Sequence, residues 1–255
     1  MKKYMISIAA LILLLPTLAM SNALSLRLGY YIPTFKGTAN SLWNIEFEQM
    51  NLKKANYQNS VLGFAYEQFF SREISFVLSI EGYNRSKTGI YNDYVGYTID
   101  GQDYAFPENL YEGDFNINHA FNVSSTPIQL SVKVMPFGRR GTVVPYIGGG
   151  VGLYLWSVKL LGYMVDFQDA WVYTDPDLGD VDIYAVKAVE LREENRISFG
   201  SHFFGGVMIP VANKLAIEAE VKFNMAWGKF RDAFEGFEKF DLGGYQLALG
   251  INYWF

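Results

Sequence analysis

Apolar and polar residues alternate strictly along many parts of this 255-residue chain. Successive side chains of a β-strand point to opposite faces, so a period of two indicates strands with one apolar face. Most of the alternating segments reach the roughly 9–11 residues that a tilted strand needs to cross a bilayer. There are eight of them: 24–32, 60–70, 74–83, 123–135, 143–157, 196–209, 214–227 and 243–255.

Short and long connections alternate between these segments. The short ones are residues 71–73, "PFGRRGT" at 136–142 and "PVAN" at 210–213, and the long polar ones are 33–59, 84–122, 158–195 and 228–242. Outer-membrane barrels have an even strand number, short periplasmic turns, long outer loops and both termini on the periplasmic side. The pattern predicts an all-β fold: an eight-stranded antiparallel up-and-down transmembrane β-barrel with short periplasmic turns and long outer loops.

The polarity of the two faces separates this barrel from a soluble sandwich with the same number of strands. One face is apolar, as in Leu26, Leu28 and Tyr30 of the first segment. The opposite face carries charged and amide side chains. A closed eight-stranded sheet cannot shield its outside except in lipid, so the apolar face is expected to face the membrane.

The first 23 residues have the features of an export signal. Lys2 and Lys3 form a basic start, residues 5–15 an apolar core, and residues 21–23 a small-residue cleavage site. We predict that residues 1–23 are a cleaved signal peptide and that residues 24–255 form one barrel domain. The remaining chain has 19 basic and 26 acidic residues, which argues against a nucleic-acid partner. With no cysteine, it cannot depend on disulfides.

The last alternating segment has an aromatic or aliphatic residue at every second position up to a terminal phenylalanine: Tyr245, Leu247, Leu249, Ile251, Tyr253 and Phe255. This pattern resembles the C-terminal signature of bacterial outer-membrane β-barrels. The overall layout is similar to the small eight-stranded group that includes the OmpA membrane domain, OmpX and OmpW. The resemblance implies an outer-membrane location in a two-membrane bacterium and recognition of this segment by the outer-membrane assembly machinery.

Ionisable residues gather on the face predicted to point into the barrel. The interior of eight strands is just wide enough for side chains to fill it, so we expect a paired polar network there. Its predicted members are Arg27, Glu67, Glu81, Lys133, His202, Glu218, Glu220 and Lys222. Lys133 should lie opposite Tyr146 or Gly148, and His202 should face Lys222 and approach Glu220. The alternative is that these charges line a narrow selective pore.

The two histidines do not define a catalytic site. Ser198 and His202 share a strand face but lie roughly 13 Å apart, which is too far for a nucleophile and its base. His119 is a candidate base with Ser124 or Ser125, although this residue combination is common by chance. The histidine-serine-asparagine motif of lipid A deacylases is absent. We therefore predict no catalytic residues.

The outer segments are expected to be polar loops. Residues 158–195 contain nine acidic residues, and "DPDLGDVD" within them departs from the order of an EF-hand, so a solvated acidic loop without metal is predicted. Residues 41–56 are expected to include a short helix, whose Trp43, Ile45, Phe47 and Met50 are candidates for packing over the barrel mouth or for contacting a partner. Interfacial girdles are assigned to Tyr66, Phe69, Phe70, Trp156, Trp227 and Tyr253.

These features favour a monomeric, non-enzymatic surface barrel without cofactors. Its outer loops would interact with outer-membrane lipids and lipopolysaccharide, with other envelope proteins or with the environment. A narrow channel for small, apolar molecules is the alternative that the resemblance to the OmpW group implies. A lipid A-modifying enzyme is the third possibility.

Overall fold

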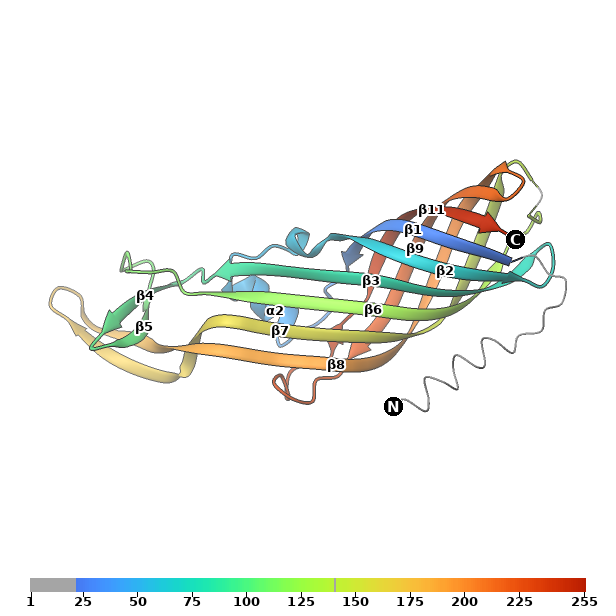
Figure 1. The fold of residues 1–255 in the computed structure, drawn as a ribbon. Helices are drawn as coiled ribbons and strands as arrows, with labels where there is room; N and C mark the ends of the chain where they lie inside the picture. Colours follow the sequence, from blue (N-terminus) through green and yellow to red (C-terminus); the bar gives the residue numbers. More distant parts are fainter. Residues whose placement is uncertain (1–21, 140) are drawn as a thin grey trace.

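Eight long strands form one closed antiparallel ring in a computed structural model that describes residues 22–139 and 141–255 (Figure 1). The strands of the ring are β1 (Asn22–Pro33), β2 (Asn59–Phe69), β3 (Ile74–Ile90), β6 (Asn118–Val134), β7 (Val144–Asp175), β8 (Gly179–Ala212), β9 (Leu215–Gly228) and β11 (Gly244–Trp254). Pairing of β11 with β1 closes it. All eight predicted segments fall on these strands, so the predicted barrel is confirmed. Residues 1–21 lie outside the described part, and cleavage of the signal stays a prediction.

The two ends of the barrel differ as the connections predicted. At one end β2–β3, β6–β7 and β8–β9 are joined by short turns, and the C-terminus lies there too (Figure 1). At the other end lie the smaller elements: α2 (Leu42–Gln49), the 3₁₀ helix η1 (Lys54–Tyr57), β4 (Tyr94–Ile99), β5 (Gln102–Pro107) and β10 (Phe240–Asp241). Helix α2 begins where the Ser41 hydroxyl accepts a hydrogen bond from the Asn44 backbone N–H.

The register sets the tilt of the strands. A path through directly paired residues starts at Asn22 of β1 and returns to β1 at Ile32, ten residues further along. On the other seven strands, the path passes through Gln68, Phe76, Val132, Gly149, Phe203, Phe223 and Tyr245. At about 3.3 Å per residue along a strand and about 4.8 Å between eight strands, this stagger corresponds to a tilt of about 40°. A barrel of this shape has a narrow interior filled by side chains.

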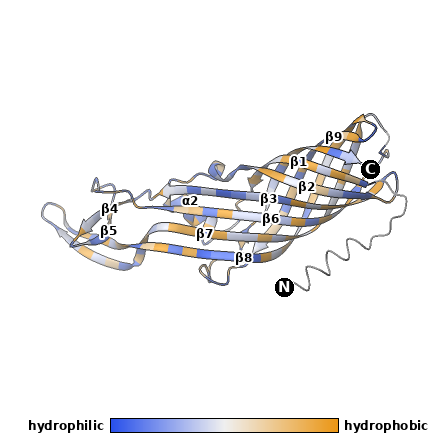
Figure 2. Cartoon of the chain, in the orientation of Figure 1, coloured by the Kyte–Doolittle hydropathy of each residue, from blue (hydrophilic) through white to orange (hydrophobic). Residues whose placement is uncertain are grey.

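The outer wall of the barrel is apolar. Along β1 exposed and buried residues alternate, and Leu28 on β1 and Leu249 on β11 are 63% and 65% exposed. The hydrophobic residues alternate with polar ones along the strands of the barrel (Figure 2). So large an exposed apolar surface on a closed sheet is stable in hydrocarbon, and we treat this wall as lipid-facing.

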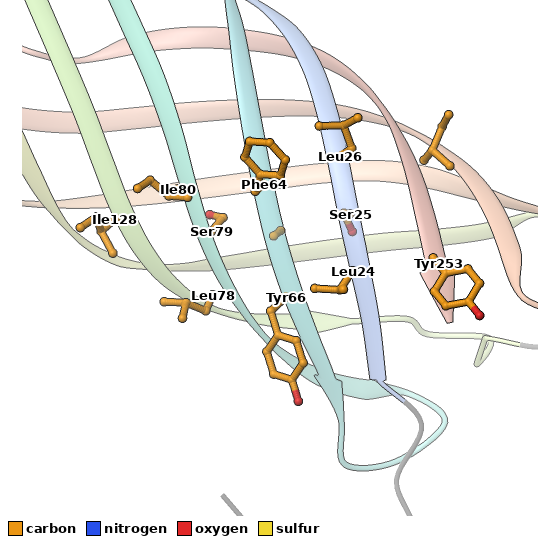
Figure 3. Close-up of a pocket in the computed structure, with 12 residues that line it drawn as sticks. Leu24, Ser25, Leu26, Phe64, Tyr66, Leu78, Ser79, Ile80, Ile128 and Tyr253 are labelled. Atoms are coloured by element: carbon orange, nitrogen blue, oxygen red, sulfur yellow. The ribbon is translucent and has the colours of Figure 1, made fainter. Parts of the chain in front are cut away.

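One part of the wall is hollowed near the short turns. A groove of about 630 Å³ lies where Leu26, Phe64 and Ile80 point outward from β1, β2 and β3 (Figure 3). Tyr66 and Tyr253 lie at its end nearest the β2–β3 turn (Figure 3). Tyrosines at this height are typical of the periplasmic girdle.

Two of the predicted girdle residues face inward instead. Phe69 and Trp156 are 2% and 3% exposed and belong to the interior, whereas Phe70, Trp227 and Tyr253 are exposed as predicted. The enrichment of aromatics at strand ends suggested a girdle. However, even and odd positions of a strand face opposite sides, and Trp156 lies on the same inward side as Tyr146 and Tyr154.

The predicted acidic loop is a β-hairpin. Strands β7 and β8 stay paired far beyond the barrel, up to the pair Asp175↔Gly179. Strand β5 pairs with β8 through Tyr104↔Ala185, and β4 pairs with β5. We call β4, β5 and residues 163–189 the outer blade, which projects away from the ring (Figure 1). Its own small core contains Val95, Phe106, Val181 and Ile183. The apolar residues that alternate with the acids in residues 158–195 pack into this core, so the segment forms a strand pair instead of a loop.

Candidate functional site in the barrel interior

The eight ionisable residues predicted to face inward all lie in the interior of the ring. Each is at most 4% exposed: Arg27, Glu67, Glu81, Lys133, His202, Glu218, Glu220 and Lys222. They come from six of the eight strands. The structure places them together, while their role in function stays a prediction.

The lower part of this network is centred on Lys133. Its ammonium group lies 3.0 Å from Glu67 Oε2 and 3.8 Å from Glu218 Oε2, and 4.0 Å from the centroid of the Tyr146 ring. As predicted, Lys133 stands opposite Gly148, whose missing side chain leaves space that the Phe204 ring occupies. The Ser75 hydroxyl also donates a hydrogen bond to Glu67.

The upper part is centred on Lys222 and is joined to the lower part by Arg27. The Lys222 ammonium group lies 2.6 Å from Glu81 Oε1 and 3.8 Å from Glu220 Oε1. Arg27 donates to Glu218 over 2.6 Å and to Glu220 over 3.3 Å. These bonds connect cations and carboxylates continuously around the interior. Buried charges are tolerated when they are paired in this way.

Four uncharged polar residues complete the network: Gln129 and Tyr146, which lie on the face predicted to point inward, and Tyr154 and Asn224, which were not singled out from the sequence. The Tyr146 hydroxyl donates toward Glu218 and Glu220, Gln129 donates to Asn224, and Tyr154 donates to the same Asn224 oxygen. The signal that could have identified them is parity, because each lies at an inward position of its strand.

The residue predicted to lie opposite His202 on β9 is wrong by two positions. Phe204 stands opposite Lys222, and His202 stands opposite Asn224. A pairing of His202 with Lys222 requires a turn centred on Ala212, but β9 begins at Leu215 and the β8–β9 register shifts between Pro210 and Ala212. His202 Nε2 instead lies 2.7 Å from the Ser131 hydroxyl oxygen.

An aromatic cap closes the interior toward the outer end. We define the aromatic cap as Trp43, Tyr57, Phe121, Trp156, Phe230 and Phe240, each at most 3% exposed. Trp43 of α2 stacks on Phe240 with 4.8 Å between ring centroids, and its indole N–H donates to the Asp241 carbonyl. The expected packing over the mouth is confirmed for Trp43 and Met50, which are buried, and for Phe47, which packs partly buried against the same cluster, whereas Ile45 is half-buried.

His119 does not lie beside a serine. Its Nε2 is 2.7 Å from Glu46 Oε2 of α2, and both residues are buried, so the pair fastens α2 to β6. The Ser124 hydroxyl bonds to the Ser157 hydroxyl instead. The prediction of His119 as a base for Ser124 or Ser125 is therefore wrong. His119 instead contacts a carboxylate of helix α2, which lies far from it in the sequence.

The interior is filled at three levels. Below the charged network lies an apolar cluster that includes Phe69, Met135, Phe204 and Met208. Between the network and the aromatic cap there is a cavity of about 20 Å³, bordered by Glu81, Tyr83 and Tyr154. A space of this size holds about one water molecule. A solute larger than water does not fit in this cavity.

Within residues 22–139 and 141–255, no group of three or more potential ligand residues could hold a metal ion. In the same part of the chain, no helix is long and apolar enough to cross a membrane.

The closed ring, its lipid-facing wall and its polar interior define the protein as a small eight-stranded outer-membrane β-barrel. No protein-family profile matches the sequence, and no curated protein matches it either. Solved structures similar to the chain include OprG from Pseudomonas aeruginosa, with 13% identity, a TM-score of 0.49 and coverage of 92% of this chain and 96% of that one. Neisserial surface protein A follows, with 12% identity, a TM-score of 0.45 and coverage of 92% and 97%. Ail from Yersinia pestis has 11% identity, a TM-score of 0.42 and coverage of 92% and 99%.

Proposed function

We propose that this protein is a non-enzymatic, closed surface barrel that holds the outer blade outside the cell for contact with a partner there. The filled interior carries the proposal: within the described residues, the charged network, the aromatic cap and the apolar lower cluster pack the lumen at three levels, and the cavity between the network and the cap is about 20 Å³. The apolar outer wall anchors the barrel in the membrane, and a packed lumen leaves contact with other molecules to the outer end.

The outer blade supports this proposal because it has a defined structure of its own. At its tip, Asp175 accepts hydrogen bonds from the backbone N–H groups of Asp177 and Leu178, and these bonds lower the pKa of the Asp175 carboxyl. Nearer the barrel, Lys187 pairs with Asp166 and Asp169 at 2.7 and 3.1 Å. Between Trp156 and Asp175 the strand could span roughly 60 Å at 3.3 Å per residue. Such a blade can present its acids and exposed aromatics well beyond the headgroups.

Single-channel recording tests the closed lumen. The refolded protein is measured in a planar bilayer beside Lys133→Ala and Glu220→Ala. We expect no steady openings from the wild type, because no continuous water path crosses the interior. Steady openings that change with either substitution would overturn the closed barrel and place the channel first.

Cysteine labelling tests the orientation, since the chain has no cysteine of its own. A cysteine at Leu178, at the tip of the blade, should react with a membrane-impermeant maleimide on intact cells. The control is a cysteine at Ser71 in the β2–β3 turn, which should react only after the outer membrane is permeabilised. The reverse order of labelling would refute the outer position of the blade.

One observation favours the channel alternative. The β3–β6 pairing skips from Ile80↔Ile128 to Tyr83↔Ser125. The skipped part includes Pro127, which has no N–H to donate, and both Gly82 and Pro127 border the 20 Å³ cavity. Opening of the wall here would admit a small apolar molecule from the side. Cellular uptake of such molecules that depends on expression of the protein would support it even without ionic conductance.

The catalytic alternative has one matching geometry. Ser131 and His202 lie within the hydrogen-bond distance of a nucleophile and its base. Both are buried, and the His202 ring stacks on Phe204, so a substrate has no access to them. We expect expression of the protein to leave the lipid A mass spectrum of its host unchanged, and a new lipid A species that disappears in Ser131→Ala would contradict this.

A further inference from the structure

The outer rim of the barrel carries a basic groove where two strands separate. The pairing of β8 with β9 ends at Gly200↔Ala226, and above this point β9 pairs with β10 instead. A groove of about 630 Å³ lies there between β8 and the segment that follows β9. We call it the rim groove; its lining residues are Asn195, Arg196, Ile197, Ser198, Phe199, Trp227, Lys229, Arg231 and Lys239.

The charge of the rim groove is entirely positive. Four of its lining residues are basic and none is acidic. Arg196 is neutralised by ion pairs with Glu193 and Asp232. Within the described residues, the side chains of Lys229, Arg231 and Lys239 form no ion pair, and all three are exposed. Three uncompensated cations thus face one hollow in a chain whose overall charge is negative.

The backbone on either side of the groove is held in place. Glu193 is fully buried and accepts hydrogen bonds from the backbone N–H groups of Arg231 and Asp232. On the other side, Trp156 donates its indole N–H to the Ser198 hydroxyl. These hydrogen bonds hold β8 and the segment after β9 apart, and this separation shapes the groove.

The height of the groove places it at the outer headgroups. From Ile209 to Phe199, β8 presents outward-facing residues over ten positions, which at about 3.3 Å each and a tilt of about 40° span about 25 Å. This equals the apolar band of an outer-membrane barrel. Phe199, 82% exposed, and Trp227 thus mark the upper edge of the hydrocarbon, and the cations lie directly above it.

From this juxtaposition we propose that the rim groove binds the phosphorylated headgroup of an outer-leaflet lipid. Lys229, Arg231 and Lys239 contact the phosphates, while the acyl chains descend along Phe199 and Trp227. A membrane lipid fits better than a free anion because the groove joins cations to exposed apolar side chains. The proposal is independent of whether the lumen is closed and of what the outer blade binds.

The test measures binding to the refolded protein in neutral phosphatidylcholine nanodiscs. The probes are diphosphorylated lipid A, a dephosphorylated lipid A with the same acyl chains, and inorganic phosphate. The variant combines Lys229→Gln, Arg231→Gln and Lys239→Gln, and the matched control combines Lys53→Gln, Lys54→Gln and Lys87→Gln, which removes the same charge elsewhere on the outer side. Heat-dependent gel mobility shows whether each barrel is folded. Lys229→Gln with Lys239→Gln replaces the triple variant if that one does not fold.

We expect the wild type and the control to prefer the phosphorylated lipid at least tenfold. Removal of three cations should weaken its binding roughly hundredfold, and rising salt should weaken binding to the wild type. Equal binding of both lipids by the wild type would overturn the proposal, as would retention of the preference in the triple variant. Displacement of the lipid by inorganic phosphate at low millimolar concentration would also overturn it, since the groove would then be a free-anion site.

Discussion

Lys133→Met is the substitution that probes the charged network most directly. Lys133 is fully buried and neutralises Glu67 at 3.0 Å and, at longer range, Glu218 at 3.8 Å. Methionine is of similar length but leaves the Glu67 carboxylate without a cation, with the Ser75 hydroxyl still donating a hydrogen bond to it, while Glu218 keeps Arg27. Removing one partner of a buried pair costs about 3–5 kcal/mol. We expect a loss near the lower end of that range, because one of the two carboxylates remains paired.

The size of this effect depends on burial, which a second pair of variants isolates. Lys187→Met removes a lysine that also contacts two carboxylates, Asp166 and Asp169, but in the exposed blade. An exposed pair contributes about 0–1 kcal/mol, so this control should change stability little. Lys133→Met combined with Glu67→Gln removes both buried charges and should recover about half or more of the loss.

The free energy of unfolding is measured by urea titration in phospholipid vesicles, with tryptophan fluorescence and gel mobility as probes. A loss below about 1 kcal/mol for Lys133→Met would refute the argument that this ion pair is desolvated. So would a double variant that is less stable than Lys133→Met alone, because the uncompensated Glu67 charge would then not be the cause.

Two further predictions concern the barrel wall and the blade. A Cβ added at Gly150 would lie 2.0 Å from the Leu130 carbonyl oxygen, so Gly150→Ala should lower the free energy of unfolding by about 1–3 kcal/mol in the same titration. The control is Gly82→Ala, which should be tolerated because a Cβ there meets nothing within 4 Å. Equal losses for the two variants would contradict this prediction. The hydrogen bond from Lys187 lowers the pKa of Asp166, so its contribution to the blade is present above the ordinary carboxyl pKa near 4 and is lost as the pH falls through the lowered value. Hydrogen exchange of residues 163–189, compared between pH 7 and pH 3, should show loosening at low pH in the wild type and not in Asp166→Asn, and a blade equally protected at both pH values would refute it.

Local periodicity determined most of the architecture from the sequence. Period-two alternation located the eight strands, their two faces and the inward position of all eight ionisable residues, because strand parity is a local property of the chain. Alternating loop lengths determined the up-and-down order. The position of the β6–β7 turn predicted Tyr146 or Gly148 opposite Lys133, and Gly148 is the residue that stands there.

Only the tertiary structure decided which side chains meet across the barrel. His202 stands opposite Asn224 rather than Lys222 because a two-residue change at one turn shifts the whole β8–β9 register. It lies beside Ser131 because both residues pair with Gly150 of β7, which has no side chain between them. His119 meets Glu46, 73 positions away, because the first loop folds back over the mouth. The rim groove exists because β9 leaves β8 for β10, and the acidic segment is a hairpin because its apolar residues found partners in β4 and β5. These contacts depend on closure of the ring and on loop packing. Both bring together residues that are far apart in the sequence, and no local pattern indicates that they meet.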